Sequence, residues 1–255
     1  MNASILNGPL LPLRKRLSVS RTLAKLPPAP RVQAPPIRPA YRVLGRAHAS
    51  VLGLLGAVQV LDDARRSSNT TAKGRMSKVE VDVVRSAIVF TSAGLDATMK
   101  RLVNDVGRAL VPRPGTGARH QYEQYFKQSL AASSIDAHLR DAVIDLDPTT
   151  RLLEVYLSER TRSSYQGSTD LKARVRSVLG ISRTSVPDAD LEELDEFFVA
   201  RNAIAHDMDL KDPATDSIAR HHRDVEVVVG QCDQVFSAAA QLIGGAADAY
   251  KRAGL

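Results

Sequence analysis

Residues 77–111 constrain the fold most, because their apolar residues follow the spacing of one long helix. Ser77 and Glu80 form the signature of a capping box, in which each side chain bonds the other residue's backbone N–H. Pro112 and Pro114 end the pattern, since proline does not continue a helix. The opening KVEVDVV alternates like a strand, but the later apolar positions are helical: Val81, Val84, Ile88, Leu95, Leu102 and Val106. Such a helix must bury its apolar stripe against other helices.

The rest of the chain supports the same fold class. Helical apolar spacing recurs in several shorter stretches, which Gly167, Gly180 and Pro187 separate, and it returns in a long final stretch that begins near Ile218. Asp190 and Glu193 are the expected cap pair of the penultimate helix. We found no βαβ alternation, no glycine-rich phosphate loop and no repeat. The sequence predicts an all-α protein, an antiparallel bundle of long core helices with these shorter helices between them: 120–132, 135–146, 150–162 and 171–181.

Residues 1–40 hold the whole excess of positive charge. They contain seven basic residues and no acidic one, so the 35 basic residues of the chain fall to 28 in positions 41–255, against 28 acidic. The high pI therefore does not indicate nucleic-acid binding by the folded part. Eight of the 13 prolines also lie in 1–40, which disfavours the amphipathic helix of an organellar targeting peptide. We expect a disordered basic, proline-rich tail at 1–40 and a helical domain at 41–255.

The compartment is expected to be the cytoplasm. The lone cysteine, Cys232, excludes an internal disulfide framework and a cysteine-based zinc site. The most apolar stretch, 43–61, is interrupted by Arg46 and His48, so we expect a buried helix and no membrane partner. No apolar core followed by a small-residue cleavage site precedes it, as a secretory signal would require.

The stretch FFVARNAIAHDMDL at 197–210 carries the main functional signal. At about 100° per residue, Arg201 lies at the centre of an apolar stripe on its helix, and an unpaired guanidinium in a core costs several kcal/mol, roughly. Arg201 must therefore pair with an acid, reach an interface or bind an anion. Asn202 and His206 lie on one flank of the same helix. The apolar stripe around Arg201 consists of Leu194, Phe197, Phe198, Ile204 and Ala205.

A purely structural interpretation stays open on spacing alone. Buried charges are usually paired, so Arg201 could pair with Glu154 or Asp195 in a helical scaffold where His206 is incidental. The same weak Arg-to-His spacing occurs at Arg42–His48 and Arg113–His120, although neither has a polar partner at a helix end.

The motif RNAIAH at 201–206 resembles the hallmark of the HEPN superfamily: an arginine, a polar residue and then a histidine on the penultimate helix of an all-α domain. The hydrophobic helix at 85–103 is similar to the first core helix of that superfamily. The resemblance covers about residues 41–252, and the branch it is most similar to is the RiboL-PSP-HEPN-like group of bacterial conflict systems.

The resemblance implies a metal-independent endoribonuclease that acts as a toxin or antiphage-defence effector. His206 would move protons, Arg201 would meet the phosphate oxygens, and Asn202 would bond the phosphate or orient His206. Attack by the 2′-hydroxyl would restrict cleavage to RNA. The family also implies a homodimer with two motifs in one cleft, an RNA substrate, a cognate antitoxin, and neither metal nor cofactor. We assign Asp195 and Asp207, which bracket the motif, to substrate binding.

A second functional interpretation of the same motif stays open. A non-catalytic HEPN-like module would use the groove to bind RNA, a nucleotide or a protein.

His221 and His222 are adjacent and therefore point to different sides of a helix, which does not suit a metal site. His222 falls on the apolar stripe of the expected last helix, so we expect it to be a core histidine.

Overall fold

The computed structural model describes residues 22–30, 35–68 and 76–255. Within these ranges the protein is helical, and the sole β-type pairing is one isolated bridge between Leu210 and Arg220. The all-α prediction is confirmed. The helices, in chain order, are α1 (Arg38–Ser68), α2 (Lys78–Leu110), α3 (Gly117–Ala131), α4 (Ala137–Val143), α5 (Pro148–Thr161), α6 (Ser168–Leu171), the π-helix η1 (Lys172–Arg176), α7 (Asp188–Glu192), α8 (Asp195–Asp207) and α9 (Val225–Arg252).

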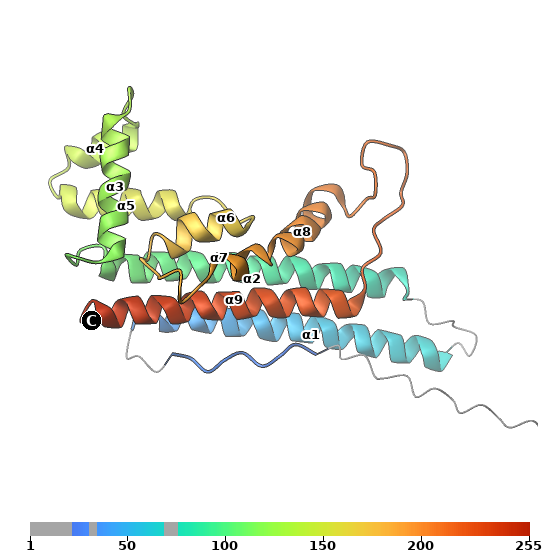
Figure 1. Cartoon of the computed structure of the whole chain (residues 1–255). Helices are drawn as coiled ribbons and strands as arrows, with labels where there is room; N and C mark the ends of the chain where they lie inside the picture. The colour runs from blue at the N-terminus through green and yellow to red at the C-terminus, as the bar shows by residue number, and fades with distance from the viewer. Residues whose placement is uncertain (1–21, 31–34, 69–75) are drawn as a thin grey trace, which may run out of the picture.

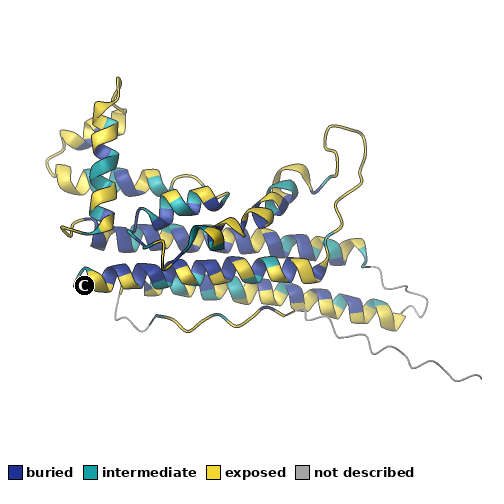
Figure 2. Ribbon diagram, viewed as in Figure 1, coloured by how far each residue is buried: buried dark blue, intermediate teal, exposed yellow. Residues whose placement is uncertain are grey.

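Three long helices, α1, α2 and α9, lie side by side and form the body of the molecule (Figure 1). Helix α2 is central, because it contacts α1, α9, α5, α8 and α3. Its residues are buried on most of its circumference, including Val84, Ile88 and Leu95 (Figure 2). The predicted capping box is present: Ser77 N–H donates to Glu80 Oε2 at 2.7 Å, and Glu80 N–H donates to Ser77 Oγ at 3.2 Å. The strand-like alternation at its start is thus overridden by the helix.

Close approach of α1 and α2 depends on a glycine. A Cβ at position 94 would lie 2.3 Å from Ala47 Cβ, a separation that real Cβ atoms do not reach. Gly94 therefore has no room for any side chain, and the two longest helices contact each other through their small residues at this level.

Helices α3, α4 and α5 form an arm beside one end of the bundle (Figure 1). Aromatic rings hold α3 against α5, with Tyr122 and Tyr156 at 5.4 Å between centroids and Tyr125 and Tyr156 at 5.3 Å. The first pair is edge-on and the second is tilted, and such ring contacts favour a fixed packing of the two helices. The helices predicted in this stretch are present, each within a few residues of the expected bounds.

Two predicted helix starts are wrong. The last helix begins at Val225 and not near Ile218, because Asp224 caps it by accepting from Glu226 N–H at 2.8 Å and Val227 N–H at 3.3 Å. The Asp190–Glu193 pair does not start the penultimate helix. Instead the short α7 ends at Glu192, and α8 begins at Asp195 after Leu194.

The predicted boundary at residue 40 falls inside α1, which begins at Arg38. Residues 22–30 run along the bundle (Figure 1), where Leu23 is buried and Ala24 N–H donates to Asp233 of α9 at 2.9 Å. His48 of α1 lies 2.8 Å from the Ala24 carbonyl oxygen. This part of the expected tail therefore packs on the helical domain. The expected disorder of 1–21 and 31–34 lies outside the described residues.

Helix α1 is, by length and composition, able to cross a membrane, and it is the one such helix among the described residues. Core helices of soluble proteins pass the same test. One side of α1 packs on the bundle through Leu44, Val51, Leu55 and Val58, while Leu52 and Val60 are exposed. The expected burial therefore holds for one face only.

Candidate functional site

Helix α8 is fixed to the bundle by its apolar residues. Phe197 and Phe198 are buried and pack edge-on at 5.6 Å, and Ala200 and Ile204 are buried with them. Helix α8 contacts α2, which anchors it to the bundle. The predicted stripe is confirmed except at Ala205, which is exposed.

Arg201 is half-buried on this helix, as its position on the apolar stripe predicts. Its Nη1 donates to Asn202 Oδ1 at 2.8 Å. Within the described part of the chain it forms no ion pair: Glu154 pairs with Arg151, and the Asp195 carboxylate binds elsewhere. The guanidinium is therefore held by an amide and keeps its charge uncompensated, which leaves it able to bind an anion.

His206 and Asp207 form the exposed end of α8. His206 stands on the last turn, one turn beyond Asn202, and among the described residues its imidazole has no hydrogen-bond partner. An exposed and unpartnered imidazole can exchange protons with a bound ligand. The structure thus brings Arg201 and Asn202 into contact and places His206 further along the same helix.

Asp195 has a structural partner. Its carboxylate accepts from Ser168 N–H at 3.0 Å and from Ser168 Oγ–H at 2.9 Å, which ties the start of α8 to the start of α6. These bonds occupy both carboxylate oxygens of Asp195, whereas the Asp207 side chain, at the other end of the helix, has no hydrogen bond or ion pair among the described residues. Substrate binding by either residue stays a prediction.

A buried ion cluster after α8 escaped the sequence analysis. Asp209 is fully buried and accepts from Arg85 Nε of α2 at 2.8 Å and from Arg223 Nε at 3.0 Å. A second bond joins Arg223 Nη2 to the other carboxylate oxygen. Arg85 also donates to Asp82 at 2.9 Å and to the His221 carbonyl oxygen at 3.0 Å. The cluster therefore joins α2 to both ends of the segment between α8 and α9.

The charge of Asp209 is stabilised by its two arginines. Burial raises the pKa of the Asp209 carboxyl, but hydrogen bonds and charges from Arg223 and Arg85 outweigh it, so the pKa lies below its ordinary value. The backbone is unusual at the same point, since Met208 and Asp209 have φ angles of 52° and 63°. Aspartate tolerates this left-handed region better than most residues.

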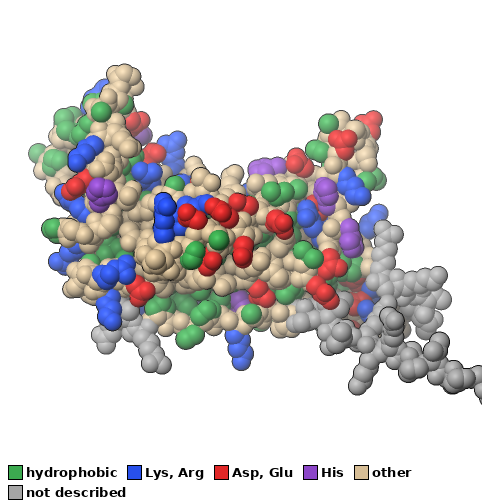
Figure 3. All heavy atoms as spheres, in the orientation of Figure 1, with side chains coloured by type: hydrophobic (Ala, Val, Ile, Leu, Met, Phe, Trp, Pro, Cys, Tyr) green, Lys and Arg blue, Asp and Glu red, His purple; other side chains and the backbone are tan. Residues whose placement is uncertain are grey.

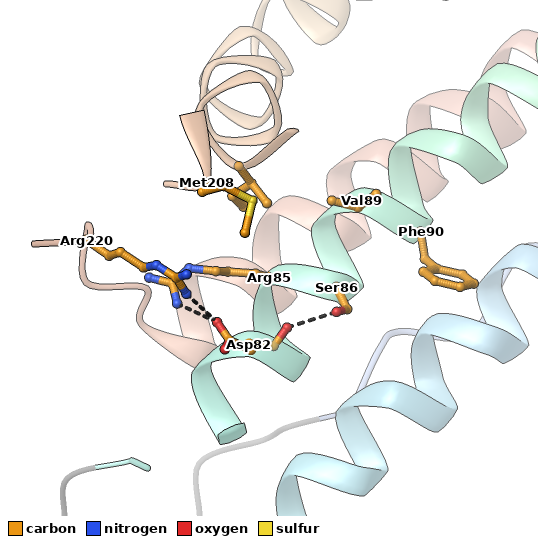
Figure 4. A pocket seen from close by; sticks show the side chains of 8 residues that line it. Asp82, Arg85, Ser86, Val89, Phe90, Met208 and Arg220 are labelled. Carbon is orange, nitrogen blue, oxygen red and sulfur yellow. Dashed lines mark hydrogen bonds and ion pairs between the residues drawn. The ribbon is translucent and has the colours of Figure 1, made fainter. Parts of the chain in front are cut away.

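Two adjoining cavities lie between α2, the end of α8 and the segment that precedes α9. In the first, about 270 Å³ in volume, Asp82 bridges Arg85 and Arg220, and Met208 and Phe90 lie at separate points of the lining (Figure 4). The second is larger and continues along the start of α2 past His221 and His222. Ile204 and Met208, which flank His206 in sequence, line the first cavity, but Arg201, Asn202 and His206 line neither.

The surface over the end of α8 and the segment after it mixes histidine, acidic, basic and apolar side chains (Figure 3). His222 belongs to this surface: it is exposed and precedes α9, so the expectation of a core histidine is wrong. The error follows from the misplaced start of the last helix. No cluster of three or more potential metal-ligating side chains occurs in the described ranges.

Comparison of the chain with protein-family models, with curated proteins and with solved structures found no match.

Proposed function

We propose that the protein is a metal-independent endoribonuclease of the HEPN type, with its site at the exposed end of α8. The observation that carries the proposal is the state of Arg201. Its guanidinium is half-buried, bonded to Asn202 and without a carboxylate partner in the described part of the chain, on the same helix as an exposed histidine. A charge left unpaired in this way is best accounted for by an anionic ligand.

The chemistry assigned to these residues is transesterification of an RNA phosphodiester. The 2′-oxygen forms a bond to phosphorus while the bond from phosphorus to the 5′-oxygen breaks, which leaves a 2′,3′-cyclic phosphate and a 5′-hydroxyl. The 2′-hydroxyl loses one proton and the leaving 5′-oxygen gains one, so the step releases no net proton. His206 accepts the first proton or supplies the second, and a water molecule takes part in the other transfer. Arg201 binds the phosphate oxygens as their charge grows, and Asn202 holds the guanidinium in place.

The proposal includes a homodimer in which two α8 ends face one cleft. Exposed apolar side chains at the first cavity support such a contact, because Phe90 is 53% exposed and Met208 is 62% exposed. Val199, on α8 itself, is exposed as well. Two-fold pairing through this surface would bury these side chains and bring two copies of Arg201 and His206 together. Two facing guanidinium groups repel, which favours binding of a phosphate between them.

A defined RNA tests the activity directly. Wild-type protein, with a chelator present, is incubated with an oligoribonucleotide and with a copy carrying 2′-deoxyribose at the mapped cleavage position. We expect cleavage of the first, products ending in 2′,3′-cyclic phosphate, and no cleavage at the substituted position. Binding without cleavage, in every buffer, would instead indicate a non-catalytic RNA-binding module. Cleavage that occurs without the chelator and stops when it is added would refute the metal-independent mechanism.

The proposal also includes a biological setting, which rests on the resemblance of the RNAIAH motif alone. In this setting the protein is a toxin or antiphage effector in the cytoplasm, and it has a cognate antitoxin. Expression in a bacterial host is the direct test. Wild-type protein should arrest growth and degrade RNA, whereas a His206→Ala variant at equal abundance should not.

A further inference from the structure

The segment directly after α8 is held more tightly than its sequence indicates. Asp209 is fully buried, whereas His206 and Asp207, three and two residues earlier, are exposed. Its carboxylate is bonded by Arg85 from α2 and by Arg223 from the segment before α9. A buried carboxylate that lost these guanidinium groups would be left uncompensated, which is strongly destabilising.

The backbone of Asp209 closes the last turn of α8. Its N–H donates to the Ala203 carbonyl oxygen at 2.8 Å, across the turn that contains His206. Its carbonyl oxygen accepts from His221 N–H at 2.9 Å, which pairs the chain leaving α8 with the chain returning to α9. Met208 and Asp209 both have positive φ at this point. His206 thus lies between Ala203 and Asp209, which this backbone hydrogen bond joins, and the ion cluster holds Asp209.

We propose that Asp209, acting through Arg85 and Arg223, is the residue that positions His206 for catalysis. The inference rests on the proposed ribonuclease function. Asp209 touches no substrate in this account; it sets the position and rigidity of the α8 end, and a preorganised base or acid is what a fast proton transfer requires. Helix ends otherwise fray, because their last carbonyl groups lack partners within the helix.

The decisive variant is Asp209→Asn. Asparagine has nearly the same shape and tolerates positive φ, so the substitution removes the charge and preserves the turn. Asp216→Asn, at an exposed position of the same segment, is the matched control. Two readouts are needed: amide hydrogen exchange in peptides covering 203–210 and 85–103, and kcat and KM on the oligoribonucleotide.

In the Asp209→Asn variant we expect the amide hydrogens of 203–210 to exchange at least about tenfold faster than in wild type. Exchange in 85–103 should be much less affected. We expect kcat to fall by about tenfold or more with KM within about twofold, since the change acts on the reacting group and not on ground-state binding. Asp216→Asn should match wild type. Unchanged exchange at 203–210 would overturn the proposal, and so would faster exchange of equal size throughout the chain.

Two further outcomes are separable. If Asp209→Asn does not fold, Arg223→Gln takes its place, because Arg85 still compensates the carboxylate, and the same two readouts apply. If wild-type protein cleaves no RNA, the proposed function fails; the exchange result then decides by itself whether Asp209 holds the end of α8.

Discussion

Arg85 and Arg201 are two partly or wholly buried arginines on neighbouring helices, and they are held in opposite ways. Arg85 is buried between two carboxylates, with Nε on Asp209 and Nη1 on Asp82. Arg201 is half-buried and bonded to a neutral amide, and the described residues offer it no carboxylate. The arginine at position 85 thus completes a buried ion cluster, whereas the arginine at position 201 remains able to bind an anion. The two arginines differ in their partners as well as in their depth of burial.

The largest expected difference is in stability. Arg85→Ala removes the buried ion pair with Asp209 and the bonds to Asp82 and to the His221 carbonyl oxygen, so we expect a loss of about 3–5 kcal/mol in the free energy of unfolding. Arg201→Ala breaks one hydrogen bond to Asn202, and its expected cost is within about 1 kcal/mol. Denaturant unfolding of both variants measures the two values. Equal losses would remove the distinction between the two arginines.

Acid unfolding should report the cluster through Asp209. Its folded pKa lies below the ordinary value, so the stabilisation is present above the unfolded pKa, about 3.9, and is lost as pH falls through the folded pKa. We expect the stability difference between wild type and Asp209→Asn to be constant near neutral pH and to shrink as the solution becomes acidic below the unfolded pKa. Unfolding curves across pH 2–7, roughly, measure it. A difference that grows towards acid would contradict the assigned direction.

RNA binding should depend on Arg201 and not on a solvated arginine. We expect Arg201→Ala to weaken binding of a non-cleavable 2′-O-methyl RNA by about 10- to 100-fold, the value of charge-assisted hydrogen bonds of about 1.5–3 kcal/mol. Arg183, an exposed residue whose nearest carboxylate oxygen is 3.9 Å away, supplies the control Arg183→Ala. Fluorescence anisotropy at fixed salt measures both. Equal binding by wild type and Arg201→Ala would return Arg201 to a structural role.

The smallest expected effect separates the two roles open to Asp195. Asp195→Ala removes two hydrogen bonds to Ser168, so we expect a stability loss of about 1–2 kcal/mol. If its role is structural, RNA affinity and cleavage stay at the wild-type level well below the melting temperature. A loss of RNA affinity in a fully folded Asp195→Ala protein would support its assignment to substrate binding.

The sequence predicted what local spacing encodes. The capping box and proline stop located α2 closely, and the apolar stripe located α8 with Arg201 on its buried side. The Asp209 cluster could not be predicted, because its bond to Arg85 joins residues 124 positions apart. One signal was present: an aspartate just past a helix end favours the left-handed region. The start of α9 was missed because Ile218 kept the helical register, although Asp224 is a good cap.

In the proposed mechanism Arg201 and His206 act as one site. A double-mutant cycle measures this most directly, with RNA cleavage rates for wild type, Arg201→Ala, His206→Ala and the double variant, all shown to be folded. Residues that act as a unit are strongly non-additive, so we predict that each single change abolishes nearly all cleavage and that the double variant is no slower. Wild-type cleavage in either single variant would contradict the account.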